Sequence, residues 1–285
     1  MNKLYALAVI FSFLCFSVTV TGQPTHQHSE ELYSRNLSRF VQLTIIDPQP
    51  GFANNRTNLL LLNDGQDMDK FRVKAIIDSL SVKKMIGQVL VVGIHASDRL
   101  KEYGVAGMSD YLGRGDLSAA YQAFIAEELY PYLKKTPVVQ RFNSIVIAGC
   151  SLGGLAAFDM AWGHPNLINK VGVFSGSFWW RDKDDKDPSY TDEKDRIMLN
   201  KVRTSGKRKR LPCWFYAGAK EESSDRDNDG IIDVIDDTRD LIKLIKSKCP
   251  ASQSEIKYTE DLEGLHDYPW WSRQLAGFLL WAFGK

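Results

Sequence analysis

A serine set between glycines is the first feature of this sequence that could do chemistry. Ser151 lies in Gly149-Cys150-Ser151-Leu152-Gly153, a G-x-S-x-G pattern that follows the apolar run 145–148 and precedes small, helix-compatible residues. A sharp strand-to-helix turn of this kind raises the hydroxyl above a sheet and points the helix amino terminus at a developing oxyanion. The other interpretation is a tight turn with a capping serine. We favour a catalytic nucleophile because the chain also supplies residues suited to act as its base and its acid.

A base and an acid follow Ser151 in the chain. His266 comes after the last expected strand and before the last expected helix, where a base could take the serine proton. Glu221 follows the expected strand 213–217 and would hold the imidazole in the correct tautomer. Glu222 is the second choice, and an ordinary solvated acidic loop is the alternative to both. The order serine, acid, histidine is the one expected of such hydrolases.

Two backbone amides are expected to hold the oxyanion. The apolar run Leu59 to Leu62 leads into Asn63-Asp64-Gly65-Gln66, and a loop after an early strand supplies one donor in serine hydrolases of this architecture. We therefore predict the N–H groups of Gln66 and Leu152 as the pair. The alternative for this loop is a plain turn.

Three further side chains are predicted to line the substrate pocket. Trp179 and Trp180 follow the strand 170–174, at the edge of the sheet where Ser151 is expected. Aromatic rings there could stack on a sugar or a phenolic acyl group, or could instead pack beneath an insertion. His95 ends the strand 89–94 but precedes the serine, so we assign it to the pocket and not to the triad.

An acidic loop resembles a calcium-binding loop. Carboxylates stand at loop positions 1, 3, 5, 9 and 12, with glycine at position 6; they are Asp225, Asp227, Asp229, Asp233 and Asp236. Aspartate at the last position shortens the reach towards an ion, and no flanking helix pair is evident. The alternative is an Asp-rich turn. Any calcium would be structural, since ester hydrolysis by this triad requires no cofactor.

The elements that must position these residues alternate along the chain. Expected strands cover 40–46, 59–62, 89–94, 144–148, 170–174, 213–217 and 255–259, and expected helices lie near 68–80, 118–134, 152–162, 237–248 and 270–282. Apolar strands separated by helices indicate a mainly parallel sheet with helices on both faces. The fold class is therefore α/β, and the strand–serine–helix turn at Ser151 favours the α/β-hydrolase fold.

The domain organisation is read from composition. Residues 1–22 combine Lys3 with a long apolar run and predict a cleaved signal peptide, with a membrane anchor as the alternative. Residues 23–38 read as a loose lead-in and 39–285 as one domain, with a charged, lid-like insert at about 181–210 that holds a short helix near 194–201. Such a protein would be exported, periplasmic or secreted, and free of the membrane after cleavage.

The charge balance excludes a nucleic-acid-binding protein, and the cysteine content suggests one disulfide. The chain has 36 basic and 35 acidic residues, so a mature protein without Lys3 would be neutral and would lack the basic surface that nucleic-acid binding needs. Three cysteines would remain. Cys213 starts one strand and Cys249 ends the helix before the next, which suggests a disulfide, while Cys150 is expected to be a buried free thiol.

At this point the sequence resembles the esterase family of α/β-hydrolases that includes enterochelin, feruloyl and acetyl-xylan esterases, S-formylglutathione hydrolases and mycolyltransferases. The resemblance covers roughly residues 40–283. It rests on the segments 60–66, 91–103, 124–132, 149–154, 175–177, 218–221 and 264–271. The family acid is often aspartate at the place that Glu221 occupies. The resemblance implies an esterase and leaves the ester open.

We therefore expect acyl transfer to water through an ester of Ser151, with His266 moving the proton and Glu221 orienting the ring. The expected partner is a small-molecule or glycan ester, attached to a carbohydrate or belonging to a siderophore. Two alternatives are a non-catalytic glycan-binding protein on the same scaffold and an acyltransferase that uses an alcohol acceptor.

Overall fold

The computed structural model describes residues 24–48, 57–135, 141–208 and 210–285. Eight strands form one sheet in the order β1-β2-β4-β3-β5-β6-β7-β8. They are β1 (Gln27–Ser34), β2 (Arg39–Ile46), β3 (Thr57–Asn63), β4 (Val89–Ile94), β5 (Phe142–Cys150), β6 (Lys170–Phe174), β7 (Cys213–Gly218) and β8 (Ile256–Asp261). The strands from β4 to β8 pair in parallel, and β2 pairs antiparallel with both β1 and β4. The predicted α/β-hydrolase architecture is confirmed.

Nine α-helices connect the strands in the described part of the chain. They are α1 (Val73–Val82), α2 (Arg99–Glu102), α3 (Ser118–Ala123), α4 (Tyr130–Leu133), α5 (Leu152–Gly163), α6 (Asp192–Asp195), α7 (Ile197–Thr204), α8 (Asp233–Lys248) and α9 (Tyr268–Phe283). A π-helical turn, Phe124–Leu129, joins α3 to α4, so the helix expected near 118–134 is present as a single run. None of the described helices has the length and apolar character needed to cross a membrane.

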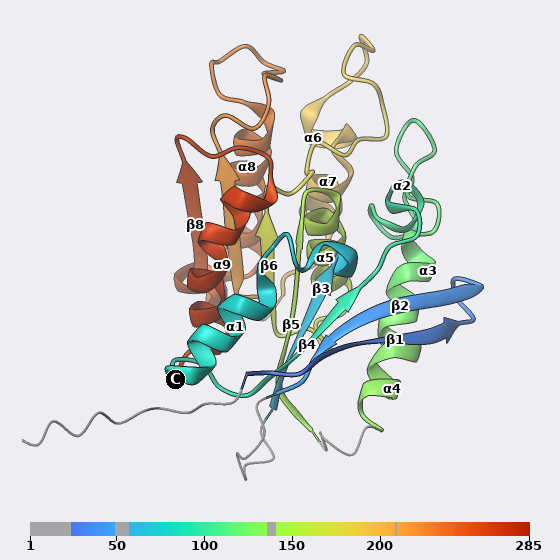
Figure 1. Ribbon diagram of the computed structural model, residues 1–285. Helices are drawn as coiled ribbons and strands as arrows, with labels where there is room; N and C mark the ends of the chain where they lie inside the picture. Colours follow the sequence, from blue (N-terminus) through green and yellow to red (C-terminus); the bar gives the residue numbers. More distant parts are fainter. Residues whose placement is uncertain (1–23, 49–56, 136–140, 209) are drawn as a thin grey trace, which may run out of the picture.

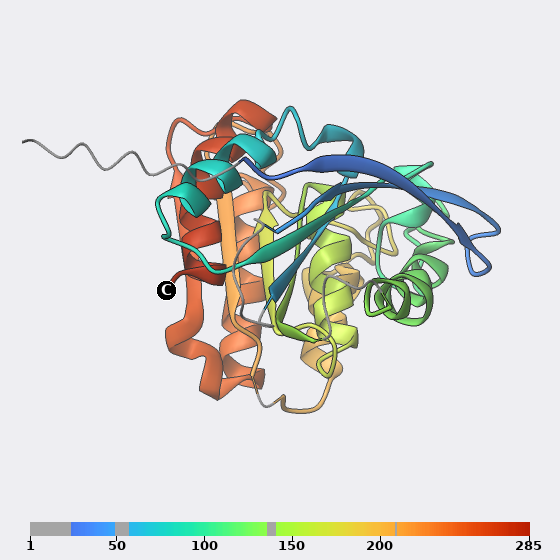
Figure 2. The same ribbon diagram turned by 60° about the horizontal axis from the view of Figure 1, so that its bottom comes forward.

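Both faces of the sheet are buried, as continuous apolar strands predict. Successive residues of a strand point to opposite faces, and in β3 Leu59 and Leu61 join one core cluster while Leu60 and Leu62 join the other. Helices α1 and α9 cover the second cluster, and α5, α7 and α8 cover the first (Figure 2). This arrangement leaves the carboxyl ends of the parallel strands as the edge where loops can gather polar side chains (Figure 1).

The prediction that residues 23–38 form a loose lead-in is wrong. Residues 27–34 form β1, an edge strand paired antiparallel along its whole length with β2. The strand alternates exposed and half-buried positions, so its sequence lacks the apolar signal by which the other strands were recognised. The predicted signal peptide, residues 1–22, lies outside the described residues.

The insert at about 181–210 divides into two parts. Helix α7 packs into the core, with Ile197, Met198, Leu199 and Val202 all buried. The loop 181–191 and α6 stand above the strand ends (Figure 1). Ion pairs tie this upper part to α8 and to the loop before it: Arg196 binds the buried Asp237 of α8 at 2.6 Å, and Arg226 of that loop binds Asp192 at 3.0 Å.

The predicted Cys213–Cys249 disulfide is not present. Both residues are buried free thiols, and Cys213 Sγ donates to the Leu211 carbonyl at 3.2 Å. Cys150 is a buried free thiol as expected, and burial raises its pKa well above the usual value.

Candidate active site

Ser151 lies at the tip of a strained turn between β5 and α5. Its φ of 55° and ψ of −126° are unusual for a residue with a side chain, and strain of this kind is held in place by the surrounding structure. A Cβ atom on Gly149 would lie 2.3 Å from the Gly153 carbonyl oxygen, so the turn tolerates only glycine there. The Ser151 N–H donates to Phe174 of β6 at 2.9 Å, which fixes the turn to the neighbouring strand.

Glu221 and His266 form a hydrogen-bonded pair at the same end of the sheet. His266 Nδ1 lies 2.8 Å from Glu221 Oε2. The Glu221 side chain is 1% exposed and the His266 side chain 39%, so the carboxylate is covered while the imidazole remains open to a ligand. Glu222, the second choice for the acid, instead accepts the Val234 N–H at 2.9 Å and caps the start of α8.

A close backbone approach brings the two residues together. Gly218 ends β7 and Gly264 precedes His266, and a Cβ on Gly218 would lie 2.5 Å from the Gly264 carbonyl. The Lys220 N–H donates to the Gly264 carbonyl at 3.0 Å, which joins the acid loop directly to the histidine loop. The pair therefore depends on backbone contacts between β7, β8 and their following loops.

The other oxygen of Glu221 is held by groups that sequence reasoning did not assign. Oε1 accepts hydrogen bonds from Ser175 Oγ and the Gly218 N–H, both at 2.5 Å. Ser175 Oγ in turn accepts the Trp271 indole N–H at 2.8 Å. The Trp271 ring stands edge-to-face with His266, with centroids 4.9 Å apart. Ser175 thus contacts the acid, Trp271 contacts the histidine, and the two are hydrogen-bonded to each other. Their positions after β6 and within α9 were visible in the sequence, but these contacts were not.

The Ser151 side chain is turned towards Ser177. Among the described residues, Ser151 Oγ has its hydrogen bond with Ser177 Oγ, at 3.4 Å, and none with His266. Catalytic hydrogen bonds are often long or unformed without substrate. A serine side chain can rotate between staggered rotamers. The observed position of the hydroxyl is therefore compatible with a hydrogen bond to His266 when substrate is bound.

The two predicted oxyanion donors have no acceptor among the described residues, so they are free to donate to a ligand oxygen. The N–H of Leu152 opens α5, and the N–H of Gln66 lies in the short 3-10 turn Gly65–Asp67 after β3. Neither N–H donates to another group within the described part of the chain. The Gln66 side chain donates to Asp64 Oδ1 at 2.9 Å, which leaves its backbone as the group available for catalysis.

The oxyanion loop is fixed from beneath. Asp64 has a left-handed backbone, with φ of 60°, and its buried carboxylate binds Arg99 Nε at 2.7 Å. Its N–H donates to the buried Tyr103 hydroxyl at 2.9 Å. Burial raises the pKa of Asp64, and Arg99 opposes that rise. Asn63 donates to the Gly153 carbonyl at 2.7 Å and so joins this loop to the nucleophile turn.

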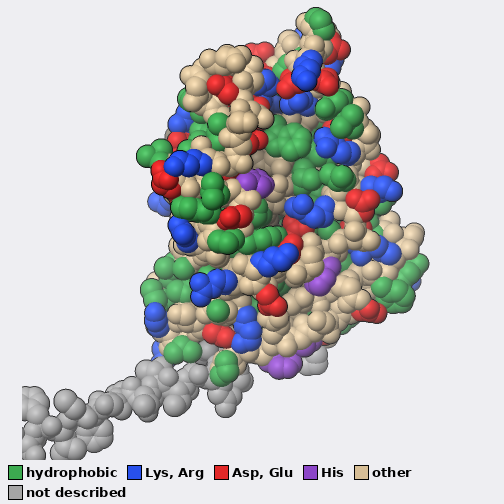
Figure 3. Space-filling view, turned by 45° about the horizontal axis from the view of Figure 1, so that its top comes forward, with side chains coloured by type: hydrophobic (Ala, Val, Ile, Leu, Met, Phe, Trp, Pro, Cys, Tyr) green, Lys and Arg blue, Asp and Glu red, His purple; other side chains and the backbone are tan. Residues whose placement is uncertain are grey.

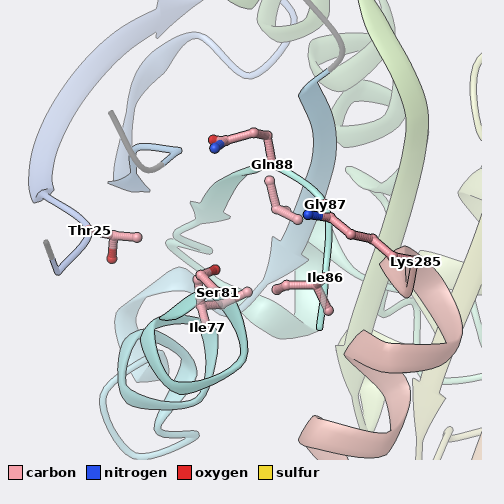
Figure 4. Close-up of a pocket in the computed structure, with 8 residues that line it drawn as sticks. Thr25, Ile77, Ser81, Ile86, Gly87, Gln88 and Lys285 are labelled. Atoms are coloured by element: carbon pink, nitrogen blue, oxygen red, sulfur yellow. The ribbon is translucent and has the colours of Figure 1, made fainter. Parts of the chain in front are cut away.

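A pocket of about 560 Å³ opens beside the histidine and is lined by Lys70, His266, Asp267, Tyr268, Pro269 and Trp271. Figure 3 views this end of the molecule and shows hydrophobic and basic side chains mixed across it. A second pocket, between α1 and the chain end, has a volume of about 20 Å³ and is lined by Ile77, Ser81 and Lys285 among others (Figure 4). That volume suits about one water molecule, and the pocket lies at the opposite ends of the strands.

The three side chains predicted to line the substrate pocket differ in burial and in their contacts. Trp180 is fully buried and lies beneath Arg114, with the guanidinium carbon 5.0 Å from a ring centroid, so its assignment to substrate is wrong. It packs against the backbone of Gly104 and Gly115, whereas the alternative to a pocket wall was packing beneath the insert at about 181–210. Trp179 is half-buried. His95 is also half-buried, and its Nε2 lies 2.8 Å from Thr44 Oγ1 next to the oxyanion loop.

The acidic loop brings together part of the predicted ligand set. Donor oxygens of Asp225, Asp227 and Asp229 lie within 4.8 Å of one another. Asp236 lies outside this group of three but within reach of its charge: burial and the charges of Asp229 and Asp227 raise the pKa of Asp236 to about 6. Asp233 is different. It is buried and accepts the Arg226 N–H at 2.9 Å while pairing with the Arg226 guanidinium, so its assignment as a ligand is wrong.

Comparison with known proteins identifies the family of this chain. The model of a family described as "Putative esterase" matches residues 34–282. This chain belongs to that esterase family. The membership makes it a hydrolase acting on esters, in agreement with the resemblance seen in the sequence.

Several known proteins are similar to this esterase at low sequence identity. The uncharacterized protein YjcH of Bacillus subtilis (strain 168) is 23% identical over 85% of this chain and 91% of its own. The enterobactin esterase FES of Shigella flexneri, solved with 2,3-dihydroxy-N-benzoyl-glycine, is 21% identical with a TM-score of 0.67. The alignment covers 90% of this chain and 59% of the Shigella protein. The siderophore hydrolase EstB of Aspergillus nidulans is 16% identical with a TM-score of 0.64, over 98% and 97% of the two chains.

Proposed function

We propose that this esterase is a serine hydrolase that works through an acyl-enzyme on Ser151. The observation that carries the proposal is the buried Glu221 carboxylate bound at 2.8 Å to an accessible His266, at the sheet end where the strained Ser151 turn lies. A Ser-His-acid set requires a nucleophile, a base with one ring nitrogen free and a carboxylate that fixes the other nitrogen.

In the proposed reaction, the Ser151 hydroxyl leaves Ser177 and attacks the ester carbonyl carbon. His266 Nε2 takes the hydroxyl proton, and Glu221 stabilises the imidazolium through Nδ1–H. The tetrahedral intermediate collapses when His266 gives the proton to the leaving alcohol. Water, deprotonated by the same histidine, then attacks the acyl-enzyme and releases the acid.

The N–H groups of Gln66 and Leu152 are proposed to hold the oxyanion. Both are free of protein acceptors in the described chain, and the helix amino terminus at Leu152 adds a favourable dipole. Loss of one such donor costs about 3–4 kcal/mol of transition-state stabilisation in serine hydrolases. The Asp64–Arg99 pair is proposed to keep the Gln66 amide in place.

The substrate is proposed to be an ester with an aromatic acyl group, carried by a siderophore or a carbohydrate. Tyr268 and Trp271 give the pocket aromatic walls, and Lys70 supplies a positive charge at its edge. An aromatic acid with phenolic hydroxyls would suit both features. The fold is also that of a siderophore hydrolase and of an enterobactin esterase, which supports this class.

An ester panel tests the proposal. Hydrolysis of p-nitrophenyl acetate, a feruloyl ester, an acetylated sugar and a catecholate siderophore is measured for the wild-type chain and for Ser151→Ala. We expect the catecholate or feruloyl ester to give the highest kcat/KM, and Ser151→Ala to lose turnover of every substrate. Equal rates for the two proteins would exclude the serine mechanism.

Catalysis is proposed to need no cofactor, and the acidic loop is proposed to bind one structural calcium ion. Asp225, Asp227, Asp229 and Asp236 would supply carboxylate oxygens, the ligands that calcium prefers. The ion would fix the loop that lies just after Glu221.

Export is proposed as well. The apolar run that follows Lys3 has the composition of a signal peptide. Amino-terminal sequencing of the protein from a cell-free culture supernatant or periplasmic extract would test it, with a start near Gln23 expected and an intact Met1 contradicting it.

A further inference from the structure

Two histidines and an aspartate meet at the edge of the sheet, far from Ser151. His26 precedes β1, and its carbonyl accepts the Asp47 N–H at 2.9 Å, so the two residues stand opposite each other. His28 lies two residues further along, in β1, and its ring stacks on the His26 ring with centroids 5.2 Å apart, so the two side chains share one face. One donor atom from each of His26, His28 and Asp47 lies within 4.8 Å of the others.

The orientation of His28 favours a ligand on Nδ1. Its Nε2 lies 3.2 Å from Glu30 Oε1, and Glu30 is itself fixed by the Tyr132 hydroxyl, which donates to Oε2 at 2.7 Å. A neutral imidazole that donates from Nε2 carries its lone pair on Nδ1. That Nδ1 is buried and has no hydrogen-bond partner within the described chain, although Asp47 Oδ2 lies 3.4 Å away.

A lone pair facing a carboxylate oxygen is satisfied by a cation between them, either a proton or a metal ion. The carboxylate that holds the far nitrogen is the arrangement found behind metal-bound histidines, where it fixes the tautomer and strengthens the ligand. His26 Nδ1 also faces Asp47 Oδ2, at 3.2 Å, a hydrogen bond whose proton a metal ion would replace. Two imidazoles and one carboxylate make a donor set suited to zinc.

The spacing also agrees with a tetrahedral ion. Zinc–ligand bonds of about 2.0–2.1 Å place neighbouring ligand atoms about 3.3 Å apart in a tetrahedron. The distances from Asp47 Oδ2 to the two Nδ1 atoms are 3.2 Å and 3.4 Å. The His26 side chain is 74% exposed, which leaves an open side for water as a fourth ligand.

The strand start that carries these residues is fixed in place. Thr25 donates to Asp78 Oδ1 through its N–H at 2.8 Å and through its hydroxyl at 2.7 Å. Figure 4 shows Thr25 across a small pocket from Ile77 and Ser81 of α1. The His26 position is therefore anchored on both sides, by Thr25 before it and by the β1–β2 ladder after it.

We propose that His26, His28 and Asp47 bind a divalent transition-metal ion of the zinc class, with Glu30 as the partner that orients His28. The ion joins the amino-terminal edge strand β1 to the end of β2. It lies outside the proposed catalytic apparatus, so it bears on stability and not on the chemistry at Ser151.

Calorimetric titration with Zn²⁺ tests this proposal. The chain is prepared without added histidines, stripped with a chelator, and compared with His28→Asn, Asp47→Asn and Glu30→Gln. We expect one zinc ion per wild-type chain at this site, and at least tenfold weaker binding after His28→Asn or Asp47→Asn. Glu30→Gln should weaken binding about 10–100-fold, as loss of an orienting partner does.

His164→Asn is the matched control, since His164 lies after α5 and away from the cluster. It should bind zinc as the wild-type chain does. Electron paramagnetic resonance of the Cu²⁺-loaded wild-type chain gives a second readout that needs no variant, and should show coupling to two imidazole nitrogens. Wild-type affinity in His28→Asn, or a copper spectrum without nitrogen coupling, would overturn the proposal.

Discussion

Glu221 and His266 are 45 residues apart in the chain and are joined by a hydrogen bond of 2.8 Å between Oε2 and Nδ1. The bond forms because β7 and β8 are neighbours in a parallel sheet and their following loops meet at Gly218 and Gly264. Much of the proposed mechanism depends on this contact, and the first prediction concerns it.

Glu221→Gln should lower kcat by about two to four orders of magnitude while the protein remains folded. A neutral amide cannot stabilise the imidazolium and can hold the ring in the wrong tautomer. Steady-state hydrolysis of p-nitrophenyl acetate measures the effect. Glu222→Gln is the matched control and should retain near wild-type kcat, because Glu222 binds the Val234 amide. The reverse result would make Glu222 the acid.

Ser175 and Trp271 are predicted to position the acid. Trp271→Phe keeps an aromatic ring beside His266 but removes the indole N–H that binds Ser175, and Ser175→Ala removes the hydroxyl that binds Glu221. A hydrogen bond to a charged group contributes about 1.5–3 kcal/mol, so Ser175→Ala should lower kcat about 10–100-fold. Trp271→Phe should have a smaller effect. KM should change little in Ser175→Ala, and a loss confined to KM would show that Ser175 acts on substrate binding instead.

Arg99→Leu should destabilise the fold and disturb the oxyanion loop. Removal of Arg99 leaves the buried Asp64 carboxylate unpaired, at a cost of about 1–3 kcal/mol, less than for a fully buried pair because Arg99 is partly exposed. Without Arg99 the folded-state pKa of Asp64, already raised by burial, rises further. The folded state then holds a proton that the unfolded chain has lost, so stability falls as pH rises through this window.

Urea unfolding of Arg99→Leu and the wild-type chain at several pH values measures that effect. The deficit should be largest at neutral pH and should shrink as the pH falls towards the ordinary aspartate range. A deficit independent of pH would place the cost in lost packing instead of an unpaired charge.

Calcium should stabilise the protein in a pH-dependent way. The folded-state pKa of Asp236 is raised to about 6 by burial and by its acidic neighbours, so without the ion stability falls as pH rises from about 4 through 6. Calcium relieves this repulsion and should raise Tm more at pH 7.5 than at pH 5. Asp227→Asn should reduce the shift, since Asp227 lies in the cluster. A Tm that does not change with calcium at either pH would contradict the site.

The sequence predicted the parts of the structure that local pattern controls. Apolar strands and a glycine-flanked serine specify their own geometry, so the strands from β2 to β8 and the turn at Ser151 were recognised correctly. The positions of Glu221 and His266 followed from the order of elements in this kind of sheet.

The remaining features depend on contacts between distant segments. Strand β1 obtains its hydrogen bonds from β2, and its polar sequence gave no sign of a strand. Trp180 turns inward beneath Arg114, a direction that a sequence cannot specify after an irregular turn. Asp233 matched the calcium-loop spacing, but Arg226 binds it, and Ser175 reaches Glu221 only because β6 and β7 are neighbours.

Mass spectrometry of the chain after treatment with a fluorophosphonate most directly tests the central claim. The wild-type protein should gain one adduct, mapped to the peptide that contains Ser151, and His266→Ala should react far more slowly because the hydroxyl is no longer activated. Ser151→Ala should gain none. An adduct on another residue, or labelling that persists in Ser151→Ala, would contradict the account.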